Sequence, residues 1–75
     1  PVLTTEEGIK QIINNLEKIT EWKNLKDLIP KFYLVNKMHK TGLAGIFAAS
    51  LELTKEGTIS ISQKKNFEEL MIKKL

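Results

Sequence analysis

A glycine between two different hydrophobic periods is the feature that most constrains the fold. Apolar residues recur at helical spacing from about residue 37 or 38 to residue 56, and Gly57 follows where it can end that helix in the left-handed conformation. Ile59 and Ile61 then alternate with serines, which is the period of a half-buried strand. The chain is therefore predicted to run from a long helix directly into a strand.

The C-terminal residues predict a partner for that strand. Leu70 and Ile72 alternate with Met71 and Lys73, and residues 64–66 are typical of a turn. We therefore expect a β-hairpin at the end of the chain.

The N-terminal segment predicts a first helix over about residues 5–19. Thr4 and Glu7 have the spacing of a capping box, in which each side chain bonds the backbone N–H of the other residue. Before them, Val2 and Leu3 offer a short strand. The apolar residues that follow the cap at helical spacing are Ile9, Ile12, Ile13, Leu16 and Ile19.

The middle of the chain predicts one short helix between two irregular segments. Residues 21–23 form a connector or a brief strand, with Trp22 in the core. Asn24 can cap a short second helix, which Pro30 ends because the residue before a proline avoids helical backbone. Residues 31–36 show no strong period and predict a loop.

Three helices and a C-terminal hairpin predict an α+β fold of the winged-helix type, with Phe32 or Tyr33 of the loop packed on its core. The 75 residues suffice for one domain, so we expect residues 1–75 to form a single winged-helix domain. Because the first residue is Pro1 rather than Met, we expect the chain to be a fragment of a longer protein.

Composition and motifs argue against several functional classes. Without cysteine, neither disulfides nor thiolate metal sites are available, which fits a cytoplasmic protein. No apolar run approaches the ~18 residues of a membrane span. The one histidine, His39, has no metal-ligand partners and is expected on the surface, and no serine has a neighbouring general base. We therefore expect no enzyme activity, no metal and no cofactor.

The basic residues are all lysines, and arginine is absent from the 12 that give a net charge of +3. Lysine neutralises phosphate, whereas arginine is the usual reader of guanine, so sequence-specific DNA recognition is disfavoured. The lysines either keep a small domain soluble or give weak affinity for DNA. At the tip of the hairpin, Lys64 and Lys65 stand where a DNA-binding wing would contact phosphate.

The long third helix carries more apolar surface than its own domain needs. Ile46, Ala49 and Leu53 share one stripe, which should face the core because Leu53 lies one turn before Gly57. The apolar arc covers roughly two thirds of the circumference, where a surface helix needs about 100°. Either the second ridge is also core, or it is an exposed patch of the kind that marks a protein interface. The residues of that second ridge are Leu43, Ala44, Phe47, Ala48 and Leu51.

The run FAASLELTKEGTISISQKKNFEELMI resembles the C-terminal domain of segregation and condensation protein A, the bacterial kleisin family. The upstream run IINNLEKITEWKNLKDLIP is also similar to that family, so the resemblance covers nearly the whole chain. Glu68 stands where the family usually has glycine. The residues that match the family pattern are Phe47, Ala49, Leu51, Glu52, Leu53, Gly57, Ile59, Ile61, Gln63, Phe67, Leu70 and Ile72.

The resemblance implies a non-enzymatic module of the chromosome condensation machinery. In that family the C-terminal winged helix binds the ATPase head of a structural-maintenance-of-chromosomes (SMC) protein and helps to close a ring around DNA. Other parts of the kleisin recruit segregation and condensation protein B, and DNA is contacted through the complex. The matching hydrophobic anchors here are Phe47 and Leu51. No membrane or small-molecule substrate is implied, and the location is cytoplasmic, at the nucleoid.

Two interpretations of the hairpin and the third helix stay open. In the first, the second ridge of the helix binds a protein, and Gln63, Lys64 and Lys65 are candidate wing contacts. Gln63 would instead stiffen the wing if its side chain bonds backbone. In the second, the chain is a nucleic-acid-binding winged helix, whose affinity would fall steeply with salt.

Overall fold

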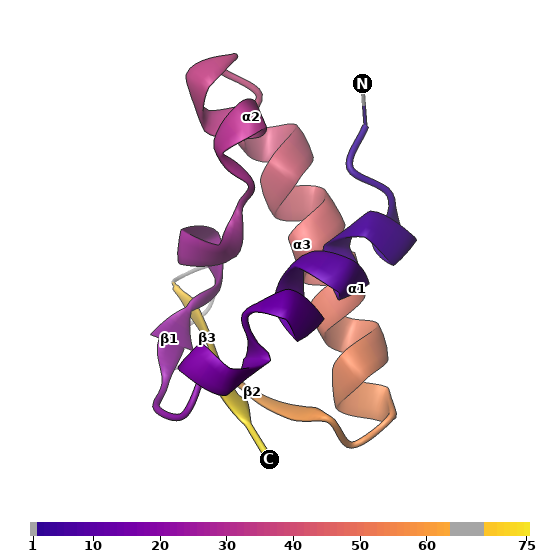
Figure 1. Cartoon of the computed structure of the whole chain (residues 1–75), viewed down its shortest axis with the longest axis vertical. Coiled ribbons are helices and arrows are strands. Elements are labelled where there is room, and N and C mark those ends of the chain that lie inside the picture. The colour runs from indigo at the N-terminus through magenta and orange to yellow at the C-terminus, as the bar shows by residue number, and fades with distance from the viewer. Residues whose placement is uncertain (1, 64–68) are drawn as a thin grey trace.

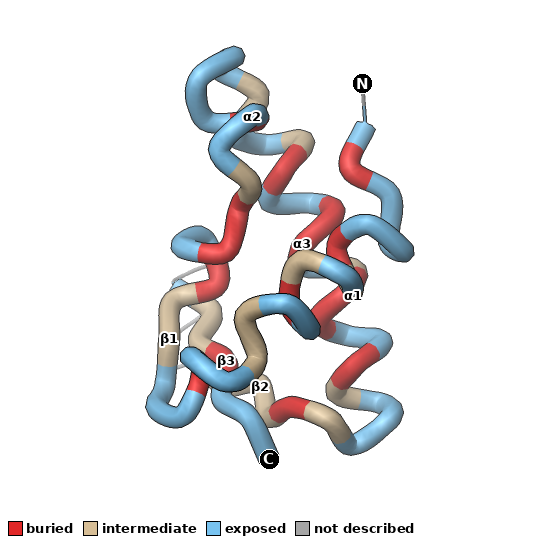
Figure 2. Tube along the Cα trace, in the orientation of Figure 1, coloured by how far each residue is buried: buried red, intermediate tan, exposed pale blue. Residues whose placement is uncertain are grey.

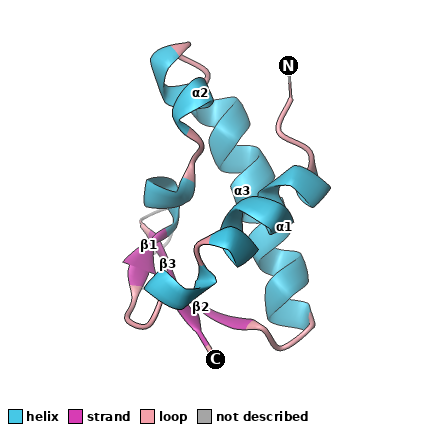
Figure 3. Cartoon of the chain, viewed as in Figure 1, coloured by secondary structure: helices cyan, strands magenta, loops and turns pink. Residues whose placement is uncertain are grey.

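The computed structural model describes residues 2–63 and 69–75 and has an α+β fold compatible with a winged helix, as predicted (Figure 1). The longest helix runs the length of the molecule, the first helix crosses it, and the strands gather at one end (Figure 3). The helices are α1 (Thr5–Asn14), α2 (Lys31–Val35) and α3 (His39–Lys55), and the strands are β1 (Lys23–Asn24), β2 (Ile59–Gln63) and β3 (Leu70–Lys74).

In the described part of the chain, these strands form an antiparallel sheet of order β1-β3-β2. The two predicted C-terminal strands are confirmed as an antiparallel pair, with Ile61 paired to Ile72, and the turn expected at residues 64–66 lies outside the described residues. The strand expected at Val2 and Leu3 is wrong, because both residues lie outside any strand. The third strand is instead β1, at the end of the connector where a brief strand was one alternative.

The first helix begins as predicted and ends earlier. Thr4 and Glu7 form the capping box: the Glu7 N–H donates to Thr4 Oγ1 (3.1 Å), and the Thr4 N–H donates to Glu7 Oε1 (3.1 Å). The helix ends at Asn14 rather than near residue 19, because the Asn15 side chain donates to the Gln11 carbonyl (2.7 Å) and caps the last turn. The chain continues as a short 3₁₀ helix, Leu16–Lys18.

The predicted second helix is confirmed, and the prediction of a loop after it is wrong. Asn24 accepts a hydrogen bond from the Lys26 N–H (3.1 Å) and starts a 3₁₀ helix, Leu25–Leu28, which ends before Pro30. Residues 31–36, expected to be a loop, instead contain α2. Pro30 is the N-cap of α2, with φ of −57° and ψ of 142°, and a helix of five residues is too short to show a period. Its Tyr33 is buried and Phe32 is exposed.

The end of α3 follows the glycine prediction closely. Gly57 has φ of +80°, the left-handed conformation that glycine adopts without a side-chain clash. Its N–H donates to the Thr54 carbonyl (3.1 Å). The next N–H, of Thr58, donates to the Leu53 carbonyl (2.9 Å). This pair of bonds is a Schellman motif, and it turns the chain into β2.

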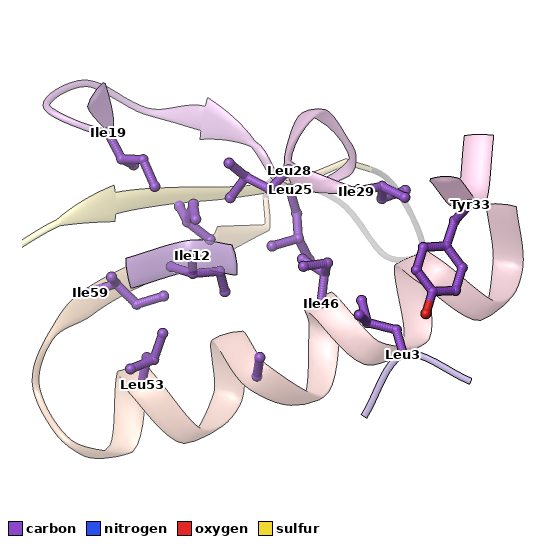
Figure 4. Close-up of a cluster of buried hydrophobic side chains, with 12 residues drawn as sticks. Leu3, Ile12, Ile19, Leu25, Leu28, Ile29, Tyr33, Ile46, Leu53 and Ile59 are labelled. Atoms are coloured by element: carbon purple, nitrogen blue, oxygen red, sulfur yellow. The ribbon is translucent and has the colours of Figure 1, made fainter. Parts of the chain in front are cut away.

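The core lies between α1, the inner side of α3 and one face of the sheet (Figure 4). The predicted inner stripe is confirmed, since Ile46, Ala49 and Leu53 are all buried. The prediction that Trp22 is core is wrong, because its ring is 47% exposed. Lys23 pairs with the buried Ile72, which places Trp22 opposite Lys73 on the outer face of the sheet.

Candidate functional site

The outer face of α3 carries large apolar side chains that the fold leaves exposed. Leu43 is 38% exposed, Phe47 39% and Leu51 49%, whereas the neighbouring Ile46 is fully buried. Ala44 is also exposed and Ala48 is half-buried. The expected outward direction of Phe47 and Leu51 is confirmed, and the alternative that both ridges are core is wrong. We call the five residues Leu43, Ala44, Phe47, Ala48 and Leu51 the outer ridge.

The outer ridge faces outward because small residues on the opposite side of α3 admit the rest of the chain. A Cβ atom added to Gly8 would lie 2.7 Å from the Gly45 carbonyl oxygen and 2.8 Å from the Ala49 Cβ atom. The backbones of α1 and α3 are therefore in close contact at this crossing. Buried and exposed residues alternate along the trace of α3 in Figure 2, as expected for a helix with one side in the core.

A groove separates the outer ridge from the wing. It has a volume of about 530 Å³ and is lined mainly by apolar side chains. These come from α3, from the 3₁₀ helix Leu25–Leu28 and from the wing, which consists of β2 and β3. It unites four sequence-predicted site residues, Leu43, Ala44, Phe47 and Gln63. Leu51 and Ala48 do not line it. The complete lining is Leu25, Lys40, Leu43, Ala44, Phe47, Gln63, Glu69 and Leu70.

Half of the groove lining was missed by sequence reasoning. Leu70 was assigned only as a strand residue, although its pairing with Gln63 places it at the mouth of the groove. Leu25 was assigned only to a short helix. Glu69 carried no sequence signal, because single charges at the ends of elements are common, and Lys40 was overlooked for the same reason. The helix spacing alone would have placed Lys40 beside Leu43 and Ala44.

A second, smaller concavity lies between the N-terminal segment and the first half of α3. Its volume is about 440 Å³. Ala44 and Ala48 of the outer ridge line it, and Lys40 lines it as well as the groove. Ala44 and Lys40 thus form the boundary between the two concavities. The other lining residues are Val2, Leu3, Thr5, Thr41 and Gly45.

The wing contacts are described only in part. Gln63 is exposed at the end of β2, and Lys64 and Lys65 lie outside the described residues. Next to the start of β3, the Lys26 ammonium lies 3.4 Å from the Glu69 carboxylate. This ion pair joins the 3₁₀ helix Leu25–Leu28 to the residue that precedes β3, and so connects two segments on the same side of the groove.

The titratable groups give no reactive centre within the described residues. They contain no cluster of three or more His, Cys, Asp or Glu side chains that could hold a metal ion. His39 is exposed, as expected. Hydrogen bonds from the Thr4 backbone and hydroxyl lower the pKa of Glu7, which is a structural role at a helix cap. What the site offers is apolar surface with a few charged groups at its margin.

Comparison with known proteins identifies a family for the chain. No helix among the described residues has the length and hydropathy needed to span a membrane. No curated protein and no solved structure gives a significant match. The family model for Segregation and condensation protein ScpA matches residues 3–75, nearly the whole length. The chain therefore belongs to the ScpA family, the kleisins of SMC complexes, which act in chromosome segregation and condensation.

Proposed function

We propose that this chain is a non-enzymatic interaction module that binds the ATPase head of an SMC protein through the outer ridge. The observation that carries the proposal is the exposure of Leu43, Phe47 and Leu51 along one line of α3. Family membership supports the choice of partner.

The energetics favour a protein partner for this surface. Full burial of a Leu or Phe side chain contributes about 1.5–3 kcal/mol, so each of these half-exposed side chains has about 1 kcal/mol still to gain. A contiguous apolar patch on a soluble protein usually marks an interface. Nucleic acid is a poor fit to the outer ridge, because phosphates and base edges require hydrogen-bond donors and positive charge.

The wider proposal concerns the complete kleisin. The chain forms one winged-helix unit, and other parts of the kleisin bind segregation and condensation protein B. DNA is contacted through the assembled complex, and the assembly works in the cytoplasm at the nucleoid. The module needs no cofactor and has no substrate of its own.

The test is a binding measurement between the chain and the SMC head fragment. The double variant Phe47→Arg/Leu51→Arg should keep its helical circular dichroism spectrum, because both side chains already contact water. Binding should weaken at least about 100-fold, the equivalent of roughly 3 kcal/mol for the loss of buried anchors.

A matched control is available on α2. Leu34→Arg/Val35→Arg replaces two adjacent exposed apolar side chains, 44% and 66% exposed, and adds the same charge. It should bind the head as the unmodified chain does. Loss of binding in this control but not in the α3 variant would move the interface to α2. An unfolded α3 variant would show that its side chains belong to the core.

The nucleic-acid interpretation is tested with the same proteins. If the unmodified chain bound duplex DNA with an affinity that fell steeply with salt, and did not bind the head, the proposal would be wrong.

A further inference from the structure

We infer that the groove between α3 and the wing receives an apolar side chain of the partner, with a carboxylate beside it that pairs with Lys40. This inference rests on the proposed function and specifies the chemistry of the surface that docks there. It goes beyond the apolar ridge, because it assigns the groove walls and one charged residue.

The groove has the shape and lining of a site for one large apolar group. Its volume of about 530 Å³ lies within the ~300–1,000 Å³ of typical ligand pockets. Leu43 and Phe47 line one side, and Leu25 and Leu70 line the other. On the α3 side, the small side chain of Ala44 leaves space open. Apolar pockets hold the anchor residues of many protein interfaces.

The charge at the groove margin is positive among the described residues. Glu69 is already paired with Lys26, at 3.4 Å. Lys40 forms no ion pair with any residue in 2–63 or 69–75. Of the described residues that line the groove, the one with an unbalanced charge is therefore a cation, and an acidic group on the partner would complement it.

The start of α3 adds to the positive potential at this margin of the groove. The N-cap residue, Met38, makes no side-chain hydrogen bond to the helix, and the first turn contains no acidic residue. Within the first turn and its cap, no acidic side chain balances the positive end of the helix dipole. Lys40 lies in this turn and lines both concavities, so a carboxylate that crosses Ala44 from either side reaches it.

The apolar walls decide between a protein and a nucleic acid at this position. A phosphate group would also be attracted to Lys40, but Leu43, Phe47 and Leu70 offer it no hydrogen bond. A protein segment with an aliphatic or aromatic side chain next to Asp or Glu satisfies both features. We therefore commit to such a segment on the SMC head.

The experiment measures association and dissociation rates of the head fragment with charge variants. At about 50 mM salt, Lys40→Glu should lower the association rate about 10-fold, and at about 500 mM the difference should largely disappear through screening. Lys40→Met should show an intermediate loss. The control is Lys10→Glu, an exposed charge reversal on α1 away from both concavities, which should change the rate less than about threefold.

Loss of fold does not explain such a result. Lys40→Glu places an acidic residue in the first turn of α3, where it favours the helix dipole and stabilises the helix. A second variant tests the groove itself. Ala44→Trp fills the space between the walls at an exposed position, and should raise the dissociation rate at least about 10-fold.

The outcomes separate this inference from the proposed function. If Lys40→Glu associates at the rate of Lys10→Glu, or if Ala44→Trp binds normally, the inference is wrong, while the loss in Phe47→Arg/Leu51→Arg still supports head binding. If the unmodified chain does not bind the head at all, both the inference and the proposed function are wrong. If Lys40→Glu weakens only DNA binding, the occupant is nucleic acid and the inference is wrong.

Discussion

Gly8→Ala provides the sharpest test of how α3 is oriented. By helix propensity alone, alanine in place of glycine inside α1 should stabilise the helix by about 1 kcal/mol. The structure predicts the opposite sign. The new methyl group would lie 2.7 Å from the Gly45 carbonyl oxygen and 2.8 Å from the Ala49 Cβ atom, both well inside normal contact distance.

The magnitude follows from what has to move. A carbonyl oxygen and a Cβ atom cannot swing aside as a long side chain can, so α1 as a whole must shift away from α3. Overpacking of this kind costs about 1–3 kcal/mol, and we expect about 3 because the obstacle is rigid. After the gain of about 1 kcal/mol in propensity, the free energy of unfolding should fall by about 2 kcal/mol. The melting temperature should drop by about 8–16 °C.

The assay is thermal and urea unfolding followed by circular dichroism, with Lys10→Ala as the control. That exposed lysine of α1 should change the stability by less than about 0.5 kcal/mol. Adding Ala49→Gly to Gly8→Ala removes one of the two close contacts, so the double variant should lose less than the sum of the single variants. A rise in melting temperature for Gly8→Ala would refute the close crossing of the helices, and with it our account of why the outer ridge is exposed.

Two further predictions concern the helix ends. Gly57→Ala should lower the free energy of unfolding by about 1–2 kcal/mol through backbone strain alone, since φ is +80° and, apart from the chain neighbours, no described residue has an atom within 4 Å of the added Cβ. Gly57→Asn should lower the free energy of unfolding by less, and an equal loss for both variants in urea unfolding would contradict this explanation. The pKa of Glu7 is lowered in the folded chain, chiefly by the Thr4 backbone hydrogen bond, so its contribution to stability is present above the ordinary glutamate value of 4.5 and lost as the pH falls through the lowered pKa. The difference in melting temperature between the unmodified chain and Glu7→Gln should therefore narrow on acidification, and a constant difference would show that the carboxylate is not involved.

Much of the fold follows from local sequence signals with a physical cause. The capping box at Thr4 and Glu7, the cap at Asn24 and the left-handed Gly57 each depend on one or two side chains and their immediate backbone. The strands β2 and β3 follow from the alternation of apolar and polar residues, which is the period of a strand. Predictions from such local signals are correct here because no distant contact changes the conformation of these residues.

The wrong predictions concern residues whose structure depends on contacts with distant parts of the chain, or elements too short to show a period. A large aromatic residue such as Trp22 is usually buried, but the pairing of β1 with β3 turns it to the outer face. Leu3 was expected in a strand; it is buried against Gly45 without forming one. Helix α2 is too short to show a period. Pro30 ends one element and begins another, and the sequence signal indicated only the end.

The candidate site divides in the same way. The outer ridge could be predicted because it needs only the 100° step of a helix and the assignment of Leu53 to the core. The groove could not, because its second wall comes from Leu25 and Leu70, which are far apart in the chain. Only the folded chain brings them opposite Phe47.

The large apolar side chains of α3 are divided between the core and water. On the buried side Gly42, Gly45 and Ala49 stand with the large Ile46 and Leu53, and on the exposed side stand Leu43, Phe47 and Leu51. A helix that only had to stabilise its own domain would bury its largest side chains, because hydrophobic stabilisation grows with the area removed from water. Here the small residues let α1 and the N-terminal segment approach the helix backbone closely, and three large apolar side chains are left partly in water. That arrangement leaves stabilising energy unused in the isolated chain, and the proposed docking of a second apolar surface on α3 would recover it.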